Sequence, residues 1–278
     1  MVEIGTAAKD HVSFTRMNHR LTDASKKGDV LRLAIQLRNE GRLYIRGNRE
    51  LEDLFKGSID RFCEIAIRLN KAKRVLDVGA GQGLLLSFLA ELGHDCHALD
   101  VVDQPSVYPD TYGKGITFQV CNVEADVIPY PDESFDAVVC CQVLEHFSHS
   151  HLPAVREMRR VLRSGGVLEI DVPNVASLRN RSRLVRGKHI TYDYADHYLH
   201  ATPILYKGRS YYPRRHNREF TKGELELLLR EAGFQRCEVS FLKSRRYREG
   251  IERLRSVGTA IKDAIPSFRK SLIAFAYK

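Results

Sequence analysis

The stretch Val75-Leu-Asp-Val-Gly-Ala-Gly-Gln-Gly83 decides the expected fold. A short apolar run that contains one acid is followed by glycines at 79, 81 and 83 and then by a helical pattern over 84–89. This pattern predicts a buried strand that ends in a tight turn, where missing side chains let the backbone approach a ligand. The next helix then points its N-terminal N–H groups at that ligand. The spacing is G-x-G-x-G with Leu84 in the sixth position, so the dinucleotide fingerprint is not matched.

The length and composition are those of an ordinary globular protein. The 278 residues are enough for one large α/β domain with an appendage. No apolar run approaches the length of a membrane span, and residues 1–9 lack the apolar core of a signal peptide, so we expect a cytoplasmic protein. The six cysteines form no C-x-x-C pair, which favours small buried thiols over a zinc site.

Positive charge is concentrated in four segments of the chain. The formal net charge is +9, and the basic residues gather in 156–163, 179–188, 207–218 and 243–255. Each cluster by itself is typical of a solvated surface. Together they indicate an anionic partner, which could be a phosphorylated or acidic substrate, a nucleic acid or a lipid headgroup surface. The distribution of charge alone does not distinguish these three kinds of partner.

Predicted strands and helices alternate from residue 74 onward. Before that point, residues 1–70 read as polar helices that form an N-terminal cap. The alternation indicates a parallel sheet with helices on both faces, and Gly165-Gly166 is expected to turn the chain out of the second helix. The predicted strands are 74–78, 95–100, 116–121, 135–141 and 166–172, and the predicted helices are 83–92 and 151–163.

The alternation breaks between residues 174 and 220. This stretch is rich in Tyr, His and Arg, and we interpret it as a lid inserted into a single domain that spans 71–278. After it, Thr221 and Glu224 predict a capping box that begins a helix at 222–232. The remaining predicted elements are strands at 238–242 and 271–277 and an amphipathic basic helix at 247–265.

Two aspartates flank the glycine turn. Asp100 ends the second predicted strand, seventeen residues past Gly83, where its two carboxylate oxygens match the vicinal diol of a ribose. The alternative is a solvated acid at a strand end, and the glycine turn upstream favours the ribose contact. Asp77 lies inside the first strand, and we expect it to organise the turn through hydrogen bonds to backbone donors.

A second stretch, Pro131-Asp-Glu-Ser-Phe-Asp136-Ala-Val-Val-Cys-Cys-Gln-Val-Leu-Glu-His146, follows in the expected order. Together with the glycine turn and with Phe220-Thr-Lys-Gly-Glu-Leu, it resembles the class I (Rossmann-like) S-adenosylmethionine-dependent methyltransferases of the small-molecule and glycan-biosynthesis type. The resemblance covers roughly residues 70–242. It implies a doubly wound, mostly parallel seven-stranded sheet, S-adenosyl-L-methionine as cofactor and S-adenosyl-L-homocysteine as product.

The resemblance also implies where the cofactor lies. Asn122 and Val123, after the third strand, would supply the polar and apolar edges of an adenine slot. Gln142 and Val143 would lie beside the methionine part of the cofactor. The complete set of implied cofactor residues is Asp77, Gly79, Ala80, Gly81, Gly83, Asp100, Val101, Asn122, Val123, Glu124, Gln142 and Val143.

His146 is the candidate catalytic residue. It would emerge beyond the fourth strand, close to the reacting centre, where a neutral imidazole can take a proton from a hydroxyl. The alternative is a structural histidine that braces the loop. Transfer from an activated methyl donor needs little acid–base help, because alignment supplies much of the rate.

The insertion supplies the candidate substrate-binding residues. Aromatic and His rings stack on sugars and bases, and arginines clamp phosphate or carboxylate groups. The alternative is that the aromatic residues pack the insertion onto the domain. We expect no metal site, because the insertion lacks His-x-x-x-His spacing. The candidates are His197, Tyr198, Arg214, Arg215 and His216.

Three functions are compatible with these residues. The first is an O-methyltransferase, for example of polysaccharide biosynthesis, that acts on a small polar or glycan acceptor by in-line SN2 transfer. The second is a methyltransferase for RNA or DNA that binds phosphates through the basic insertion; against it, the fourth strand ends in Cys-Cys-Gln-Val without a Pro-Pro-aromatic turn or a Pro-Cys nucleophile. The third is a membrane-surface or scaffold protein that uses 247–265. The glycines and Asp100 favour a working cofactor site, so we predict the first function.

Overall fold

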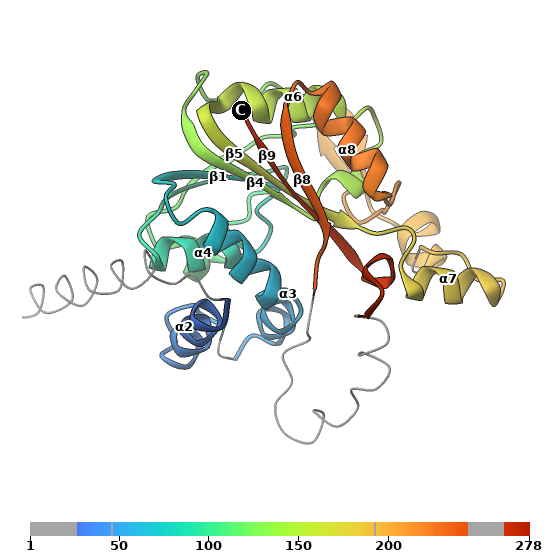
Figure 1. Cartoon of the computed structure of the whole chain (residues 1–278), viewed down its shortest axis with the longest axis horizontal. Coiled ribbons are helices and arrows are strands. Elements are labelled where there is room, and N and C mark those ends of the chain that lie inside the picture. The colour runs from blue at the N-terminus through green and yellow to red at the C-terminus, as the bar shows by residue number, and fades with distance from the viewer. Residues whose placement is uncertain (1–26, 46, 192, 244–263) are drawn as a thin grey trace, which may run out of the picture.

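A seven-stranded sheet forms the centre of the computed structural model, which describes residues 27–45, 47–191, 193–243 and 264–278 (Figure 1). Its strands are β1 (Arg74–Val78), β2 (Asp95–Asp100), β3 (Thr117–Val120), β4 (Phe135–Cys141), β5 (Leu162–Pro173), β8 (Arg236–Phe241) and β9 (Ser271–Tyr277). They lie in the order β3-β2-β1-β4-β5-β9-β8. The first five pair in parallel, whereas β9 runs antiparallel to both β5 and β8. The predicted mostly parallel, seven-stranded fold is therefore confirmed.

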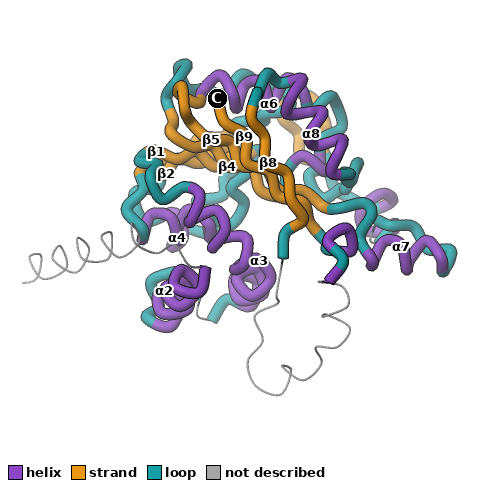
Figure 2. Tube along the Cα trace, in the orientation of Figure 1, coloured by secondary structure: helices purple, strands orange, loops and turns teal. Residues whose placement is uncertain are grey.

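Helices cover both faces of the sheet. On one face lie α2 (Lys27–Asn39), α3 (Arg49–Arg68) and α4 (Leu84–Glu91), and on the other lie α6 (Leu152–Val161) and α8 (Lys222–Glu231) (Figure 2). Alternate residues of β1 enter the two cores: Val75 packs with the first group of helices, and Leu76 and Val78 pack with the second. A parallel strand buried on both faces needs such a continuous apolar run.

The N-terminal helices share the core of the sheet. Val30, Ala34 and Leu37 of α2 and Ile59 and Phe62 of α3 are buried, as their helical spacing predicts. They belong to the same apolar cluster as β1 and α4. Residues 1–26 of the predicted cap lie outside the described residues, and so does almost all of the helix predicted at 247–265.

The predicted turn at Gly165-Gly166 is wrong. Helix α6 ends at Val161 and β5 begins at the next residue, so both glycines lie inside the strand. Gly165 has a left-handed φ of 76°, and its N–H donates to the carbonyl of Lys278 at 2.8 Å. The early part of β5 is therefore irregular, with a register shift against β4 between Phe135 and Ala137.

The 174–220 insertion begins and ends at one point. Asn174 and Phe220 form an isolated bridge, and the N–H of Phe220 donates to the carbonyl of Pro173 at 3.1 Å. After the insertion, Thr221 and Glu224 make the predicted capping box of α8. Between its ends, the insertion contains α7 (Leu178–Val185), the short helix η2 (Ala195–Leu199) and a hairpin of β6 (Ile204–Tyr206) and β7 (Arg209–Tyr211).

Three short helices complete the described structure. They are α5 (Pro109–Tyr112), η1 (Leu144–His146) and η4 (Pro266–Phe268). Across the described ranges, none of the helices combines the length and apolar character that a membrane span requires.

Candidate functional site

A cavity of about 460 Å³ lies at the carboxyl ends of β1, β2, β3 and β4. This edge is where ligands bind in open α/β sheets. Four consecutive residues of the insertion, 211–214, form part of its wall. The predicted residues that line the cavity are Gly79, Gly81, Asp100, Val101, Asn122, Val123, Glu124, Gln142, Val143, His146 and Arg214.

The turn after β1 requires glycine for two reasons. Gly79 and Gly83 have left-handed backbone angles, with φ of 78° and 72°, which side chains disfavour. Space is also short, because a Cβ on Gly79 would lie 2.4 Å from Cγ2 of Val143. A Cβ on Gly83 would lie 2.7 Å from Cε2 of Tyr112. Gly83 thus shapes the turn without lining the cavity.

Asp100 faces the cavity from the end of β2. Its Oδ2 accepts the N–H of Gly81 at 2.9 Å, and its Oδ1 accepts the N–H of Val102 at 3.0 Å. These bonds fix the orientation of the carboxylate. A carboxylate has about four acceptor positions, so Asp100 keeps capacity for two hydroxyl groups.

Asn122 and Val123 form the next part of the wall. The Oδ1 of Asn122 accepts the N–H of Glu124 at 3.1 Å, whereas its Nδ2 is buried and has no hydrogen-bond partner among the described residues. An amide donor in that position is available to a ligand acceptor. Glu124 accepts the N–H groups of Ser148 and His149 at 2.7 and 2.6 Å, so it joins two loops. The glycine turn, the Asp100 carboxylate and the Asn122 amide together fit a nucleoside, as S-adenosylmethionine requires.

Asp77 differs from its predicted role. The described residues place no hydrogen bond on its carboxylate, and Oδ1 is buried without a partner. The turn is held instead by the carbonyl of Leu99, which accepts the N–H groups of Gly79 and Ala80 at 2.7 and 3.1 Å. Burial and the nearby Asp100 raise the pKa of Asp77 to about 8. The expectation that Asp77 organises the turn through backbone hydrogen bonds is therefore wrong.

An ion pair behind the cavity holds Gln142. Nη1 of Arg61, on α3, lies 2.9 Å from Oδ1 of Asp171 on β5. The same oxygen accepts a hydrogen bond from Nε2 of Gln142, and the backbone N–H of Gln142 donates to the carbonyl of Asp171 at 2.9 Å. Gln142 has a left-handed φ of 54°. This conformation costs roughly 1–3 kcal/mol and persists only where the surrounding structure imposes it. The Arg61–Asp171 pair thus fixes a strained residue of the cavity wall.

Several acidic groups surround this ion pair. Glu169 is fully buried, and burial together with Asp171 raises its pKa well above the usual range. Burial also raises the pKa of the Cys141 thiol, whose Sγ donates to Glu169 at 3.4 Å. Burial lowers the pKa of Arg61, but the charge and hydrogen bond of Asp171 together with the nearby Cys141 and Glu169 raise it by more in total, so the guanidinium stays charged. Arg61 therefore compensates the charge of Asp171, whereas burial and Asp171 both favour the protonated form of Glu169.

His146 lies on η1 and lines the cavity. Its Nδ1 is 2.8 Å from the carbonyl oxygen of Arg215, which can only accept, so Nδ1 carries the proton. In the neutral ring the lone pair is then on Nε2. Burial lowers the pKa of His146, although the carbonyls of Arg215 and Gln142 oppose that shift. A neutral imidazole of fixed tautomer has the form that a general base requires.

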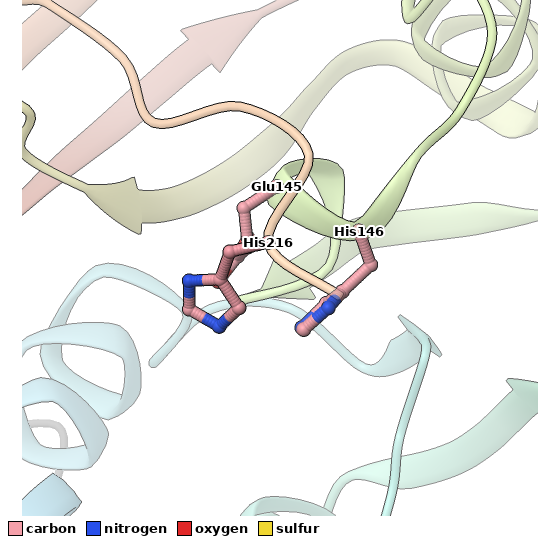
Figure 3. Close-up of side chains that lie close together, drawn as sticks. All are labelled: Glu145, His146 and His216. Atoms are coloured by element: carbon pink, nitrogen blue, oxygen red, sulfur yellow. The ribbon is translucent and has the colours of Figure 1, made fainter. Parts of the chain in front are cut away.

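Glu145 and His216 lie next to His146 (Figure 3). Glu145 is fully buried, and both of its carboxylate oxygens lack a hydrogen-bond partner among the described residues. Burial raises the pKa of Glu145 well above the usual range, and burial together with His146 lowers the pKa of His216 to about 4. Donor atoms of the three side chains lie within 4.8 Å of one another. One carboxylate and two imidazoles are donors of the kind that transition-metal ions bind.

A second group of possible metal donors is less suited to an ion. Cys141, Glu169 and Asp171 also have donor atoms within 4.8 Å of one another. The guanidinium of Arg61 already occupies Oδ1 of Asp171, so a cation there would meet a like charge.

The predicted substrate residues separate into two groups. Arg214 lines the cavity, whereas the other four lie outside the lining set. Tyr198 donates to the carbonyl of His216 at 2.6 Å, and Arg215 donates to the carbonyls of His197 and Tyr198 at 2.9 and 3.3 Å. The Arg215 guanidinium also lies 3.5 Å from the centre of the Tyr212 ring. These contacts join the parts of the insertion to one another, and substrate binding by His197, Tyr198, Arg215 and His216 stays a prediction.

The hairpin of the insertion is attached to the loop after β3. Tyr206 donates to Oδ2 of Asp126, and Nζ of Lys207 lies 2.9 Å from Oδ1 of the same residue. Asp126 follows the loop that carries Asn122 and Val123. The insertion therefore reaches from the end of β5 to the loop that follows β3.

Several residues of the cavity wall were not predicted from the sequence. Gln82 lies inside the glycine turn, and Phe147 directly follows the Leu-Glu-His stretch. Their position beside predicted site residues could have indicated that they line the cavity. Arg61 and Asp171 gave no such signal, because they meet only after folding, across 110 positions of sequence. The other unselected lining residues are Val102, Gln104, Cys121, Tyr211, Tyr212 and Pro213.

Comparison with known proteins agrees with this geometry. Residues 76–170 match the family described as "Methyltransferase domain". The ubiquinone biosynthesis O-methyltransferase of Xanthomonas axonopodis pv. citri is 30% identical over 182 residues, which cover 63% of this chain and 69% of that protein.

Solved structures share the fold at lower identity. A possible histamine N-methyltransferase of Thermotoga maritima superposes with a TM-score of 0.54 at 18% identity, over 86% of this chain and all of that one. A 1,6-didemethyltoxoflavin-N1-methyltransferase of Burkholderia thailandensis, solved with S-adenosylhomocysteine, gives 0.50 at 19% identity, over 100% and 93% of the two chains. At such identities these likenesses establish the fold.

Replacement of Asp100 by Ala should weaken the binding of S-adenosylhomocysteine by about tenfold to a hundredfold, because hydrogen bonds to a charged group are lost. Isothermal titration calorimetry measures this without any knowledge of the acceptor. The matched control is Asp103→Ala, an exposed acid that pairs with Ser106 outside the cavity lining. Equal effects of the two substitutions would show that Asp100 does not contact the ligand.

Replacement of Arg61 by Met should lower the free energy of unfolding by about 3 kcal/mol, because it leaves a buried carboxylate uncompensated. It should also weaken S-adenosylhomocysteine binding, since Gln142 loses its anchor. Denaturant unfolding and calorimetry measure the two effects.

The control for Arg61 lies on the same helix. Arg68 pairs with Glu238 at 2.9 Å in a half-exposed ion pair, so Arg68→Met should cost less than about 1 kcal/mol. Adding Asp171→Asn to Arg61→Met should recover part of the stability, because no buried charge is then left alone. If the double variant is no more stable than Arg61→Met, then Arg61 does not stabilise the fold by compensating the charge of Asp171.

Proposed function

The chain belongs to the class I S-adenosylmethionine-dependent methyltransferases, and from that membership we propose that it methylates a hydroxyl oxygen of a small polar or sugar acceptor. O-methylation is supported by the relative named above, which is an O-methyltransferase of ubiquinone biosynthesis. An acceptor that is polar and anionic is supported by Arg214, which is one of the residues that line the cavity.

The state of His146 is the observation that carries this proposal. When bound, S-adenosylmethionine supplies a methyl group that is already activated by its positive sulfur. A hydroxyl nucleophile must lose its proton during such a transfer, and Nε2 of His146 is the lone-pair nitrogen of a neutral ring that lines the cavity. The hydrogen bond to the Arg215 carbonyl keeps a proton on Nδ1 of His146, so Nε2 is the nitrogen that can accept one. A thiol or a carboxylate acceptor would have little need of such a base.

The residues of the insertion would orient the acceptor. Tyr211, Tyr212 and Pro213 line the cavity, and aromatic faces stack on sugar or aryl rings. Arg215 packs against the Tyr212 ring and holds it in place. The acceptor hydroxyl would then be aligned between this wall and His146, and such alignment supplies much of the rate.

A nucleic-acid acceptor is the second candidate. The positive charge of the insertion favours it, since phosphates bind basic surfaces irrespective of sequence. The Cys-Cys-Gln-Val end of β4 argues against methylation of exocyclic amino groups or cytosine C5.

The first experiment is transfer of labelled methyl from S-adenosylmethionine into fractionated cell extract, with and without nuclease. We expect label in a nuclease-resistant small-molecule, glycan or lipid fraction. Label that disappears after nuclease treatment would replace the proposal by the nucleic-acid candidate.

Replacement of His146 by Ala should lower kcat for a hydroxyl acceptor by about 10²- to 10⁴-fold and leave S-adenosylhomocysteine affinity nearly unchanged. In the unaltered protein kcat/KM should fall only below the ordinary histidine pKa of 6.5, because burial lowers the pKa of His146 and the base must be neutral. The control is His149→Ala, an exposed histidine paired with Glu124. Equal losses of turnover and of cofactor affinity in His146→Ala would mean that the residue is structural.

A further inference from the structure

The turn 122–126, between β3 and β4, lies on the cofactor side of the cavity. Asn122 and Val123, at its start, are part of the cavity wall. The carbonyl of Asn122 accepts the N–H groups of Ala125 and Asp126 at 2.9 and 2.8 Å, so the five residues form one tight turn. A ligand that fixes Asn122 therefore also fixes Asp126 at the other end of the turn.

Asp126 holds the tip of the β6–β7 hairpin, which belongs to the insertion. Its Oδ2 accepts a hydrogen bond from the Tyr206 hydroxyl, and its Oδ1 lies 2.9 Å from Nζ of Lys207. Only 18% of the Asp126 side chain is exposed. Burial raises the pKa of Asp126, but the hydrogen bonds from Tyr206 and Lys207 and the charge of Lys207 lower it by more in total. The carboxylate therefore stays charged, and both of its oxygens are bonded to the hairpin.

The backbone of the hairpin tip is matched to this attachment. Tyr206 pairs with Arg209, so the turn between the two strands has two residues. These are Lys207 and Gly208, and both have a left-handed φ, of 47° and 76°. Glycine adopts this conformation readily, whereas a lysine keeps it only where the surrounding structure imposes it. The contact of Lys207 with Asp126 supplies such a constraint.

The second strand of the hairpin leads directly into the proposed acceptor wall. Strand β7 ends at Tyr211, which is buried and pairs with Ile204 of β6. The rings of Tyr206 and Tyr211 meet edge to face, with 6.4 Å between their centres. Tyr211 is also the first residue of 211–214, which line the cavity. The hairpin is thus a short connection between Asp126 and the wall.

We infer that Asp126 is a positioning residue that couples the cofactor side of the cavity to the acceptor side. A cofactor bound against Asn122 fixes the turn 122–126, Asp126 then holds the hairpin tip, and the hairpin sets the position of 211–214. An acceptor that binds afterwards loses less conformational entropy, because the wall is already ordered. Coupling is reciprocal, so a bound acceptor strengthens cofactor binding by the same factor. The statement about the acceptor rests on the proposed function, whereas the coupling of the cofactor to the hairpin is tested without an acceptor.

The test is hydrogen–deuterium exchange of the full chain with and without S-adenosylhomocysteine, read by mass spectrometry. We expect the ligand to slow exchange of the backbone amides in the glycine turn 79–83 and also in the hairpin 204–211. In Asp126→Ala the slowing should remain in 79–83 and disappear from 204–211. Asp126→Asn should recover part of it, because its amide oxygen can still accept the Tyr206 hydroxyl. A merely structural role of Asp126 would change the two segments together.

Calorimetry of S-adenosylhomocysteine binding supplies an independent measurement. Asp126→Ala and Tyr206→Phe should each weaken binding by about two- to thirtyfold, because each removes a link between the turn and the hairpin. Both substitutions break the same hydrogen bond, so the double variant should bind little more weakly than Asp126→Ala. The matched control is Asp132→Ala, which removes an aspartate that pairs with Arg160 at 2.7 Å outside the cavity lining. It should change neither the affinity nor the exchange of 204–211.

Three results would overturn the inference while leaving the proposed methyl transfer intact. The first is a ligand that protects 79–83 in the unaltered protein and leaves exchange in 204–211 unchanged. The second is an Asp126→Ala variant in which the hairpin is still protected. The third is an equal loss of affinity in Asp132→Ala, which would make the effect of Asp126 non-specific. A chain that does not bind S-adenosylhomocysteine at all would overturn the methyl transfer and this inference together.

Discussion

The ion pair between Arg61 and Asp171 is the constraint on which the site depends. The pair places the guanidinium of Arg61, from helix α3, beside the buried carboxylate of Asp171 on β5. An uncompensated charge in that position would cost several kcal/mol. The strained backbone of Gln142 is held by the same Asp171. The cap is therefore connected to the cavity wall, because Arg61 and Gln142 share the same oxygen of Asp171.

The cofactor side and the acceptor side of the cavity have different origins. The glycine turn, Asp100 and Asn122 lie where parallel strands end, so the sheet itself sets their positions. The proposed acceptor side comes from 211–214, which belong to a segment joined to the sheet through β5 and α8 and to the β3 loop through Asp126. The sheet thus sets the first side of the cavity, and the insertion sets the second.

The sequence predicted best those features that are encoded locally. A buried strand, a glycine turn and an acid at the next strand end follow each other within 26 residues, and the structure has them all. The role of Asp77 was mispredicted because the competing acceptor, the carbonyl of Leu99, comes from a neighbouring strand. Helix α7 was not anticipated, since its eight residues are mostly polar and depend on Ser177 and Asn180 for their start. Contacts such as Glu145 with His216 arise only when the insertion returns to η1.

The bridge between Asn174 and Phe220 has a consequence for how this protein can change. Because the insertion leaves and rejoins the sheet at one point, its length and composition can vary without shifting the register of β5 or the start of α8. Asn174 is itself fixed by the carbonyls of Ser267 and Arg269, so the junction keeps its geometry whatever it carries. The insertion can in this sense be replaced as a unit at one junction, and its contacts with Asp126 and His146 would be replaced together with it.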